Sequence, residues 1–107
     1  MNTKVLKNKT YWTKIYMAGN FEIAKEVCRT FVESGLCVNI HITDYIYTFG
    51  EQSGFIVELI QYPKFPDTEH NILNKATDLM EILLDKCHQK SCTVMTPENS
   101  YYVERQI

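Results

Sequence analysis

The sequence lacks a strong charge of either sign, because 11 Lys and Arg residues stand against 13 Asp and Glu residues for a formal net charge of -2. Proteins that bind nucleic acid mainly through its phosphates usually carry a basic excess, so we expect no nucleic-acid partner. The sequence also lacks the roughly 18 to 20 consecutive apolar residues that cross a bilayer, and no apolar segment follows the lysines of residues 1–10. We therefore expect a cytoplasmic protein with no membrane partner.

Glycine is scarce as well, with four residues in the chain, and each is interpreted as the end of a helix or strand. The sequence therefore has no glycine-rich loop of the kind that binds phosphates. Its Ser, Cys and His residues do not fall in a recognisable nucleophile motif. Glu51 and Glu58 are interpreted as surface carboxylates of a hairpin and a sheet. On these grounds we expect a protein that is not an enzyme and has no cofactor.

A chain of 107 residues with 45% hydrophobic residues predicts one compact domain. Residues 1–10 are polar and are predicted to form a flexible N-terminal arm. Residues 11–107 are then the single folded domain.

The hydrophobic pattern predicts strands and helices in alternation. Residues 11–18 alternate as a strand, and Asn20 is a good N-cap for a helix that ends near Gly35. A half-buried strand is predicted from residue 36 to 43 with an extension to 49, followed by a loop at 50–54 and a strand at 55–62. A second helix begins after Asp67 or Thr68 and reaches Cys87. Residues 92–95 form a short fourth strand, and residues 101–103 form a last strand or a tail that docks on a neighbour.

This order predicts an α+β fold, a ferredoxin-like βαββαβ sandwich with a four-stranded antiparallel sheet and two helices on one face. If Phe55, Val57 and Leu59 point toward the helices, the alternate residues of that strand point to the other face. That outer row contains Ile56, Glu58, Ile60 and Tyr62, with Trp12 or Tyr16 beside it. Exposed apolar area of this extent is typical of an association surface, so we expect an oligomer.

Two short segments of the sequence form a recognisable pair: Phe31-Val32-Glu33 at a predicted helix end, and Cys37-Val38-Asn39 in the strand that follows it. They resemble the CutA family of divalent-cation-tolerance proteins, which is similar to the PII proteins in fold. Residues 45–50 resemble its aromatic hairpin, with Phe49 in place of Trp. The resemblance covers residues 15–103, but the family's His-Pro-Tyr-Glu segment is replaced by residues 87–90.

The resemblance implies a non-enzymatic binding or regulatory protein that forms a homotrimer, with clefts for a small-molecule or nucleotide ligand between its subunits. Two alternatives remain open at this point. The trimer could act on another protein or sequester a nucleotide-like ligand, or the chain could bind a soft metal such as copper in a metal-tolerance role.

Two sets of residues are candidates for these sites. Aromatic side chains stack bases or fill interfaces, and the predicted ligand-binding residues are Tyr45, Tyr47, Phe49 and Tyr62. Thiolates and imidazoles bind soft metals, and the predicted metal ligands are Cys37, Cys87, His88 and Cys92.

Overall fold

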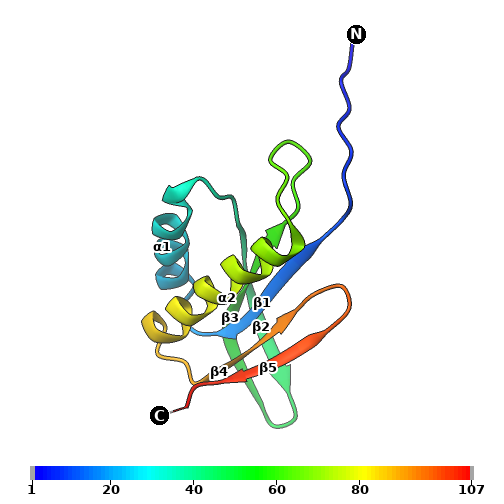
Figure 1. The fold of residues 1–107 in the computed structure, drawn as a ribbon. Helices are drawn as coiled ribbons and strands as arrows, with labels where there is room; N and C mark the ends of the chain where they lie inside the picture. Colours follow the sequence, from blue (N-terminus) through cyan, green and yellow to red (C-terminus); the bar gives the residue numbers. More distant parts are fainter. Residues whose placement is uncertain (1, 107) are drawn as a thin grey trace.

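The computed structural model describes residues 2–106 and shows two helices packed on one antiparallel sheet (Figure 1). The strands are β1 (Trp12–Ala18), β2 (Asn39–Tyr47), β3 (Gly50–Ile60), β4 (Ser91–Met95) and β5 (Ser100–Glu104). The helices are α1 (Phe21–Phe31), which continues into the short 3-10 turn η1 (Val32–Ser34), and α2 (Glu69–Lys86). The α+β class predicted from the sequence is confirmed.

The sheet has five strands in the order β2-β3-β1-β4-β5, and every neighbouring pair is antiparallel. The prediction of four strands was therefore wrong. Residues 101–103, for which the sequence predicts a last strand or a docking tail, pair with β4 of their own chain as part of β5, from Ser100 opposite Met95 to Glu104 opposite Ser91. A tight turn joins the two strands, because the Thr96 amide donates to the Asn99 carbonyl at 2.8 Å.

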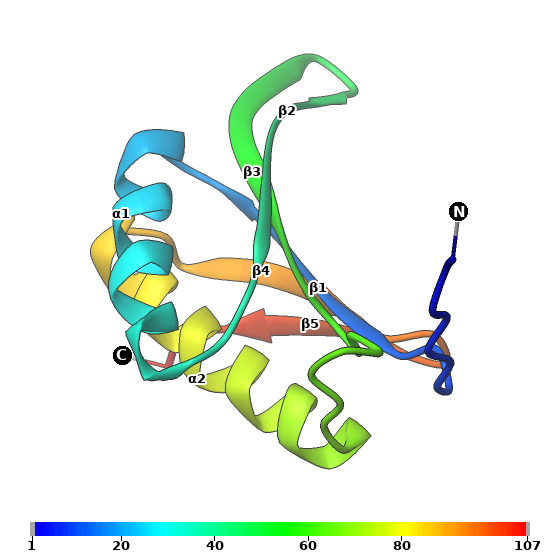
Figure 2. The ribbon, with the colours of Figure 1, turned by 90° about the horizontal axis from the view of Figure 1, so that it is seen from above.

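The core lies between the sheet and the helices, which cover the same face of the sheet (Figure 2). The strands contribute alternate residues to it, as the period of two requires. Phe55, Val57 and Leu59 of β3 are fully buried, as predicted. Their buried partners are Ile15 and Met17 of β1, Ala24 and Cys28 of α1, Ile72, Ala76, Leu79, Met80, Leu83 and Leu84 of α2, and Cys87 directly after α2.

Both helices begin at capping residues that the sequence predicts. Asn20 Oδ1 accepts a hydrogen bond from the Ile23 amide at 3.0 Å, and Thr68 Oγ1 accepts one from the Asn71 amide at 3.0 Å. Each cap satisfies an amide that has no carbonyl partner in the first helical turn. The helix starts were thus set by local chemistry.

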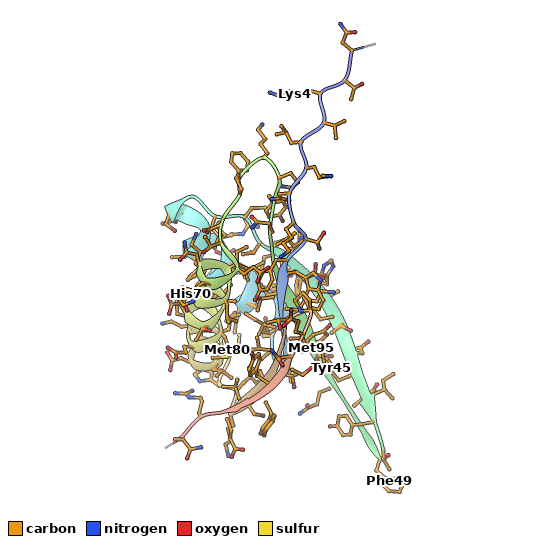
Figure 3. All side chains as sticks on the ribbon, turned by 45° about the vertical axis from the view of Figure 1, so that its right-hand side comes forward. Lys4, Tyr45, Phe49, His70, Met80 and Met95 are labelled. Atoms are coloured by element: carbon orange, nitrogen blue, oxygen red, sulfur yellow. The ribbon has the colours of Figure 1, made fainter. Side chains whose placement is uncertain are left out.

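The β2-β3 hairpin differs from the prediction. Tyr47 is opposite Gly50 in the ladder, so only Thr48 and Phe49 form the turn, and the predicted loop at 50–54 is part of β3. The hairpin extends well beyond the helices, with Phe49 at its tip (Figure 3). The glycines do not mark a loop here, because the rings of Tyr45 and Tyr47 occupy the space that side chains on Gly54 and Gly50 would fill.

Residues 2–7 are exposed and extend away from the domain (Figure 1), whereas Tyr11, directly before β1, is buried in the core. The division into a flexible arm and a domain from residue 11 stays a prediction. Within residues 2–106, no helix is both long and apolar enough to cross a membrane.

The two hairpin glycines provide a test of this packing. A Cβ on Gly54 would overlap the carbonyl oxygen of Met17, which is backbone and cannot swing aside, whereas a Cβ on Gly50 would meet only the side chain of Tyr47. We expect Gly54→Ala to lower the free energy of unfolding by about 1–3 kcal/mol, and the matched control Gly50→Ala to lower it by about 0.5 kcal/mol or less. Urea unfolding followed by circular dichroism measures both. Equal losses in the two variants would contradict this packing.

Candidate functional site

No helix of residues 2–106 covers the second face of the sheet (Figure 2), which we call the open face. Its side chains come from the alternate positions of each strand. The register across the sheet places them in rows, because antiparallel partners lie side by side on the same face. One row is Asn39, Glu58, Lys14, Met95 and Ser100, and the next is His41, Ile56, Tyr16, Thr93 and Tyr102.

Glu58 lies at the centre of a polar group on the open face. Its Oε1 is 3.4 Å from Nε2 of His41, and its side chain is 21% exposed. Asn39 is its ladder partner on β2, and Lys14 is its partner on β1. The Lys14 ammonium lies over the Trp12 ring at 4.4 Å from the centroid. A carboxylate and an ammonium on neighbouring strands suit a ligand that carries charges of both signs.

Tyr62 completes this group, which we call the carboxylate cluster: Cys37, Asn39, His41, Glu58 and Tyr62. The Tyr62 hydroxyl accepts hydrogen bonds from Asn39 Nδ2 at 3.4 Å and from Cys37 Sγ at 3.5 Å. Burial, followed by the contacts with Cys37, raises the pKa of Tyr62 to about 12. The hydroxyl therefore keeps its proton near neutral pH and can donate it in a hydrogen bond to a ligand.

The segment that holds Tyr62 is fixed to the start of α2 through Asp67. The Gln61 side chain binds both backbone groups of Asp67, whose amide lies 2.6 Å from Gln61 Oε1. The Asp67 carboxylate accepts hydrogen bonds from Lys75 Nζ at 2.7 Å, Asn71 Nδ2 at 3.0 Å and the Thr68 amide at 2.8 Å. These donors, Lys75 first, lower the pKa of Asp67 to about 2. The segment is thereby held by an ionised carboxylate.

Beside the carboxylate cluster, the open face is hollowed among three tyrosines. We call this site the tyrosine hollow; its volume is about 480 Å³ and it is lined by Tyr16, Ala18, Tyr45, Gln52, Thr93, Tyr102 and residues 88–92. The Tyr45 hydroxyl donates to the Phe55 carbonyl at 2.7 Å, which fixes the ring, and burial raises the pKa of this hydroxyl. Aromatic walls with polar groups between them are typical of sites for flat heterocycles.

His88 lies at the rim of this hollow in a left-handed conformation, with φ 54°. It follows α2, where the Gln89 amide donates to the Leu84 carbonyl at 2.9 Å. Glycine is the usual residue at such a position, and a residue with a Cβ costs roughly 1–2 kcal/mol there. Strain of this kind is often kept at functional sites.

The structure divides the four predicted ligand-binding residues among three places. Tyr45 lines the tyrosine hollow, and Tyr62 belongs to the carboxylate cluster. Tyr47 and Phe49 lie along the protruding hairpin, where Phe49 is fully exposed. Whether any of the four binds a ligand stays a prediction.

The four predicted metal ligands are not brought together either. Cys87 and Cys92 are buried in the core, Cys37 is exposed and contacts Tyr62, and His88 lies at the rim of the hollow. Burial raises the pKa of Cys87, and that of Cys92 to about 11, so both thiols stay protonated. Within residues 2–106, no three His, Cys, Asp or Glu side chains are grouped to hold a metal ion.

Reasoning from the sequence missed that Glu58, His41 and Asn39 are neighbours on the open face. Strand alternation already indicated that His41 and Asn39 point the same way and that Glu58 points outward. The missing information was the register of β2 against β3, which brings His41 opposite Ile56 and Asn39 opposite Glu58. Glu58 was therefore interpreted as an isolated surface carboxylate.

The fold and the open face define a small α+β protein with a hollow among tyrosines on the uncovered side of its sheet. No family model and no curated protein match the sequence. Two solved structures have the same fold, and both are of phage SAM lyase. The structure without ligand has a TM-score of 0.72 at 13% identity, over 100% of this chain and 98% of that one. The complex with S-methyl-5'-thioadenosine has a TM-score of 0.64 at 12% identity, over 98% and 97%.

These comparisons correct the resemblance to CutA. The structural neighbours are a SAM-degrading enzyme, and no family or curated match supports a divalent-cation-tolerance protein. The roles expected with that resemblance were wrong as well: a non-enzymatic regulatory role, an inhibitor role and a copper-binding role. The expectation that the protein is not an enzyme, drawn from the absence of a nucleophile motif and a phosphate loop, was also wrong, because the structural neighbours are a lyase. The short segments at residues 31–39 and 45–50 were too few to identify a family.

The Asp67 contacts predict how stability changes in acid. Because the pKa of Asp67 falls from 3.8 to about 2 on folding, its contribution is fully present above about pH 4 and disappears as the pH falls toward 2. We expect Asp67→Asn to lose less stability than the unmodified chain between pH 4 and pH 2. Melting temperatures at pH 4, 3 and 2 measure this, with Asp78→Asn, an exposed carboxylate further along α2, as the control. Parallel curves for all three proteins would contradict the role assigned to Asp67.

Proposed function

We propose that this chain is an enzyme that cleaves S-adenosylmethionine (SAM) and releases S-methyl-5'-thioadenosine. The observation that carries the proposal is the similarity of this fold to that of phage SAM lyase, over nearly the full length of this chain and of that protein. One of the two phage SAM lyase structures holds S-methyl-5'-thioadenosine. The open face supports it, because a hollow lined by tyrosines lies next to a cluster of charged groups. A small-molecule ligand was expected from the sequence, and the predicted homotrimer stays a prediction.

The architecture in this proposal is a ferredoxin-like βαββαβ core to which β5 is added. Strands β2-β3-β1-β4 have the order that such a core requires, and β5 extends the sheet at the edge of β4. The helices then occupy one face and leave the other for the substrate.

The two parts of the open face suit the two ends of SAM. The adenine ring stacks in the tyrosine hollow on Tyr16, Tyr45 or Tyr102, because aromatic faces bind bases through stacking. The amino-acid end lies toward the carboxylate cluster, with its ammonium group on Glu58 and its carboxylate on Lys14. Glu58 is diagonal to Tyr16 in the ladder, a separation of roughly 7–8 Å. One substrate molecule can therefore contact both parts.

The reaction breaks the bond between the sulfonium sulfur and the γ-carbon of the amino-acid end. The electron pair of this bond goes to sulfur, which becomes the neutral thioether of methylthioadenosine. In the same step the γ-carbon bonds to the carboxylate oxygen of the same molecule to form a lactone, or the β-carbon loses a proton to water and its C–H electron pair forms an alkene with the γ-carbon. Neither route consumes water, as expected of a lyase. The chain's part is to hold the reacting ends in place.

Turnover of SAM by the purified full chain tests the proposal. We expect methylthioadenosine to accumulate, as measured by liquid chromatography with a methylthioadenosine standard. A folded chain that forms none would contradict the proposed activity.

A second prediction concerns Glu58. Because a hydrogen bond between charged groups is worth about 1.5–3 kcal/mol, Glu58→Gln should raise KM for SAM at least about 10-fold. Glu104→Gln is the matched control, since Glu104 lies on the same face at the edge strand β5, and we expect it to change KM less than about 2-fold. Equal KM values for the two variants would contradict the placement of the ammonium group on Glu58.

A further inference from the structure

The face of the molecule opposite the open face carries a second concave surface, formed by α1 and α2. This groove has a volume of about 900 Å³. Its floor is apolar, from Ile23, Val27 and Phe31 of α1 and Ile82 of α2, and both isoleucines are more than one-third exposed. Apolar area of this kind on a soluble protein is typical of an interaction surface.

The rim of the groove is mainly acidic. Glu22 and Glu26 line it from α1, with Lys86 as a basic residue at one end. On α2, Asp78, Glu81 and Asp85 are exposed and lie one turn or less from Ile82. Two of these carboxylates have basic partners, Glu26 with Arg29 at 3.2 Å and Asp85 with Arg105 at 3.7 Å. The partner that fits this groove is therefore an apolar segment flanked by positive charges.

The N-terminal arm of this chain has that chemistry. Val5 and Leu6 are 82% and 51% exposed, and they stand between Lys4 and Lys7, with Lys9 further along. The arm extends away from the domain, with Lys4 far from the helices (Figure 3). An extended pair of apolar residues between lysines complements an apolar floor between carboxylates.

The arm of the same chain is too short to lie in the groove. Lys9 lines a hollow together with Glu69 and Leu73, near the start of α2. Ile82 lies nine residues beyond Leu73, or about 14 Å along the helix. When the arm is fully stretched, Val5 lies at most about 14 Å from Lys9, and Leu6 lies too close to Lys9 to reach Ile82. The apolar pair would therefore touch only the near end of its own groove.

We propose that the groove between α1 and α2 binds the N-terminal arm of a second copy of this chain, with Val5 and Leu6 on the apolar floor and the arm lysines on the acidic rim. This interaction is independent of the SAM-cleaving activity proposed above, because it uses the opposite face of the molecule. It gives the arm a partner, and it covers the exposed isoleucines of both helices.

Photocrosslinking on the full chain tests this proposal. The photoreactive residue benzoylphenylalanine replaces Val5, and chains labelled with 14N and with 15N are mixed in equal amounts and irradiated. We expect cross-links from position 5 to peptides of α1 or α2, about half of them joining a light chain to a heavy chain. Three results would overturn the proposal. They are cross-links that never join a light chain to a heavy chain, cross-links from position 5 to another surface, and the absence of any cross-link.

Charge reversal tests the acidic rim in the same experiment. We expect Lys4→Glu with Lys7→Glu to lower the yield of mixed cross-links at least about 10-fold, and the further changes Glu22→Lys with Glu26→Lys to restore it. Glu51→Lys with Glu104→Lys is the matched control, because these exposed carboxylates lie on the hairpin and the edge strand, and its yield should stay within about 2-fold. The proposal would be overturned if Lys4→Glu with Lys7→Glu left the yield of mixed cross-links unchanged. It would also be overturned if the further changes Glu22→Lys with Glu26→Lys failed to restore that yield in folded protein.

Discussion

One face of the sheet is buried under both helices, and this burial fixes where every strand residue points. Both helices pack on the face that presents Phe55, Val57 and Leu59, and the alternation of each strand then assigns every second residue to the open face. Ile56, Glu58 and Ile60 lie there because their neighbours are needed in the core. The strand residues that alternate with the core residues thus form the candidate site.

The position of β3 between β2 and β1 decides which outward side chains are neighbours. This strand pairs with β1 on one side and with β2 on the other over most of its length. The pairing brings His41 and Asn39 beside Glu58 and sets Lys14 on its other side. Side chains from three strands therefore meet on a surface of paired strands, which holds its side chains in place more firmly than a loop would.

Much of the fold could be predicted from the sequence, because its signals are local. The caps at Asn20 and Thr68 and the apolar stripe of α2 depend on neighbours within one or two helical turns. The β2-β3 hairpin was harder to predict from the sequence. Gly50 and Gly54 are typical turn residues, and only their contacts with Tyr47 and Tyr45 show that both belong to the strand. The fifth strand was ambiguous because its pairing with β4 gives little local signal.

The α+β class of the fold, the face of β3 that enters the core and the outward direction of Glu58 followed from local sequence patterns. Contacts between distant segments decided which outward residues are neighbours: they joined Tyr62 to Cys37 and Asn39, placed Tyr45 in the hollow and left Phe49 at an exposed tip. The two kinds of information differ in the distance along the chain between the residues that interact. Hydrogen bonds in a helix and alternation in a strand act between residues a few positions apart, whereas a site on a sheet depends on register between strands that are distant in the chain.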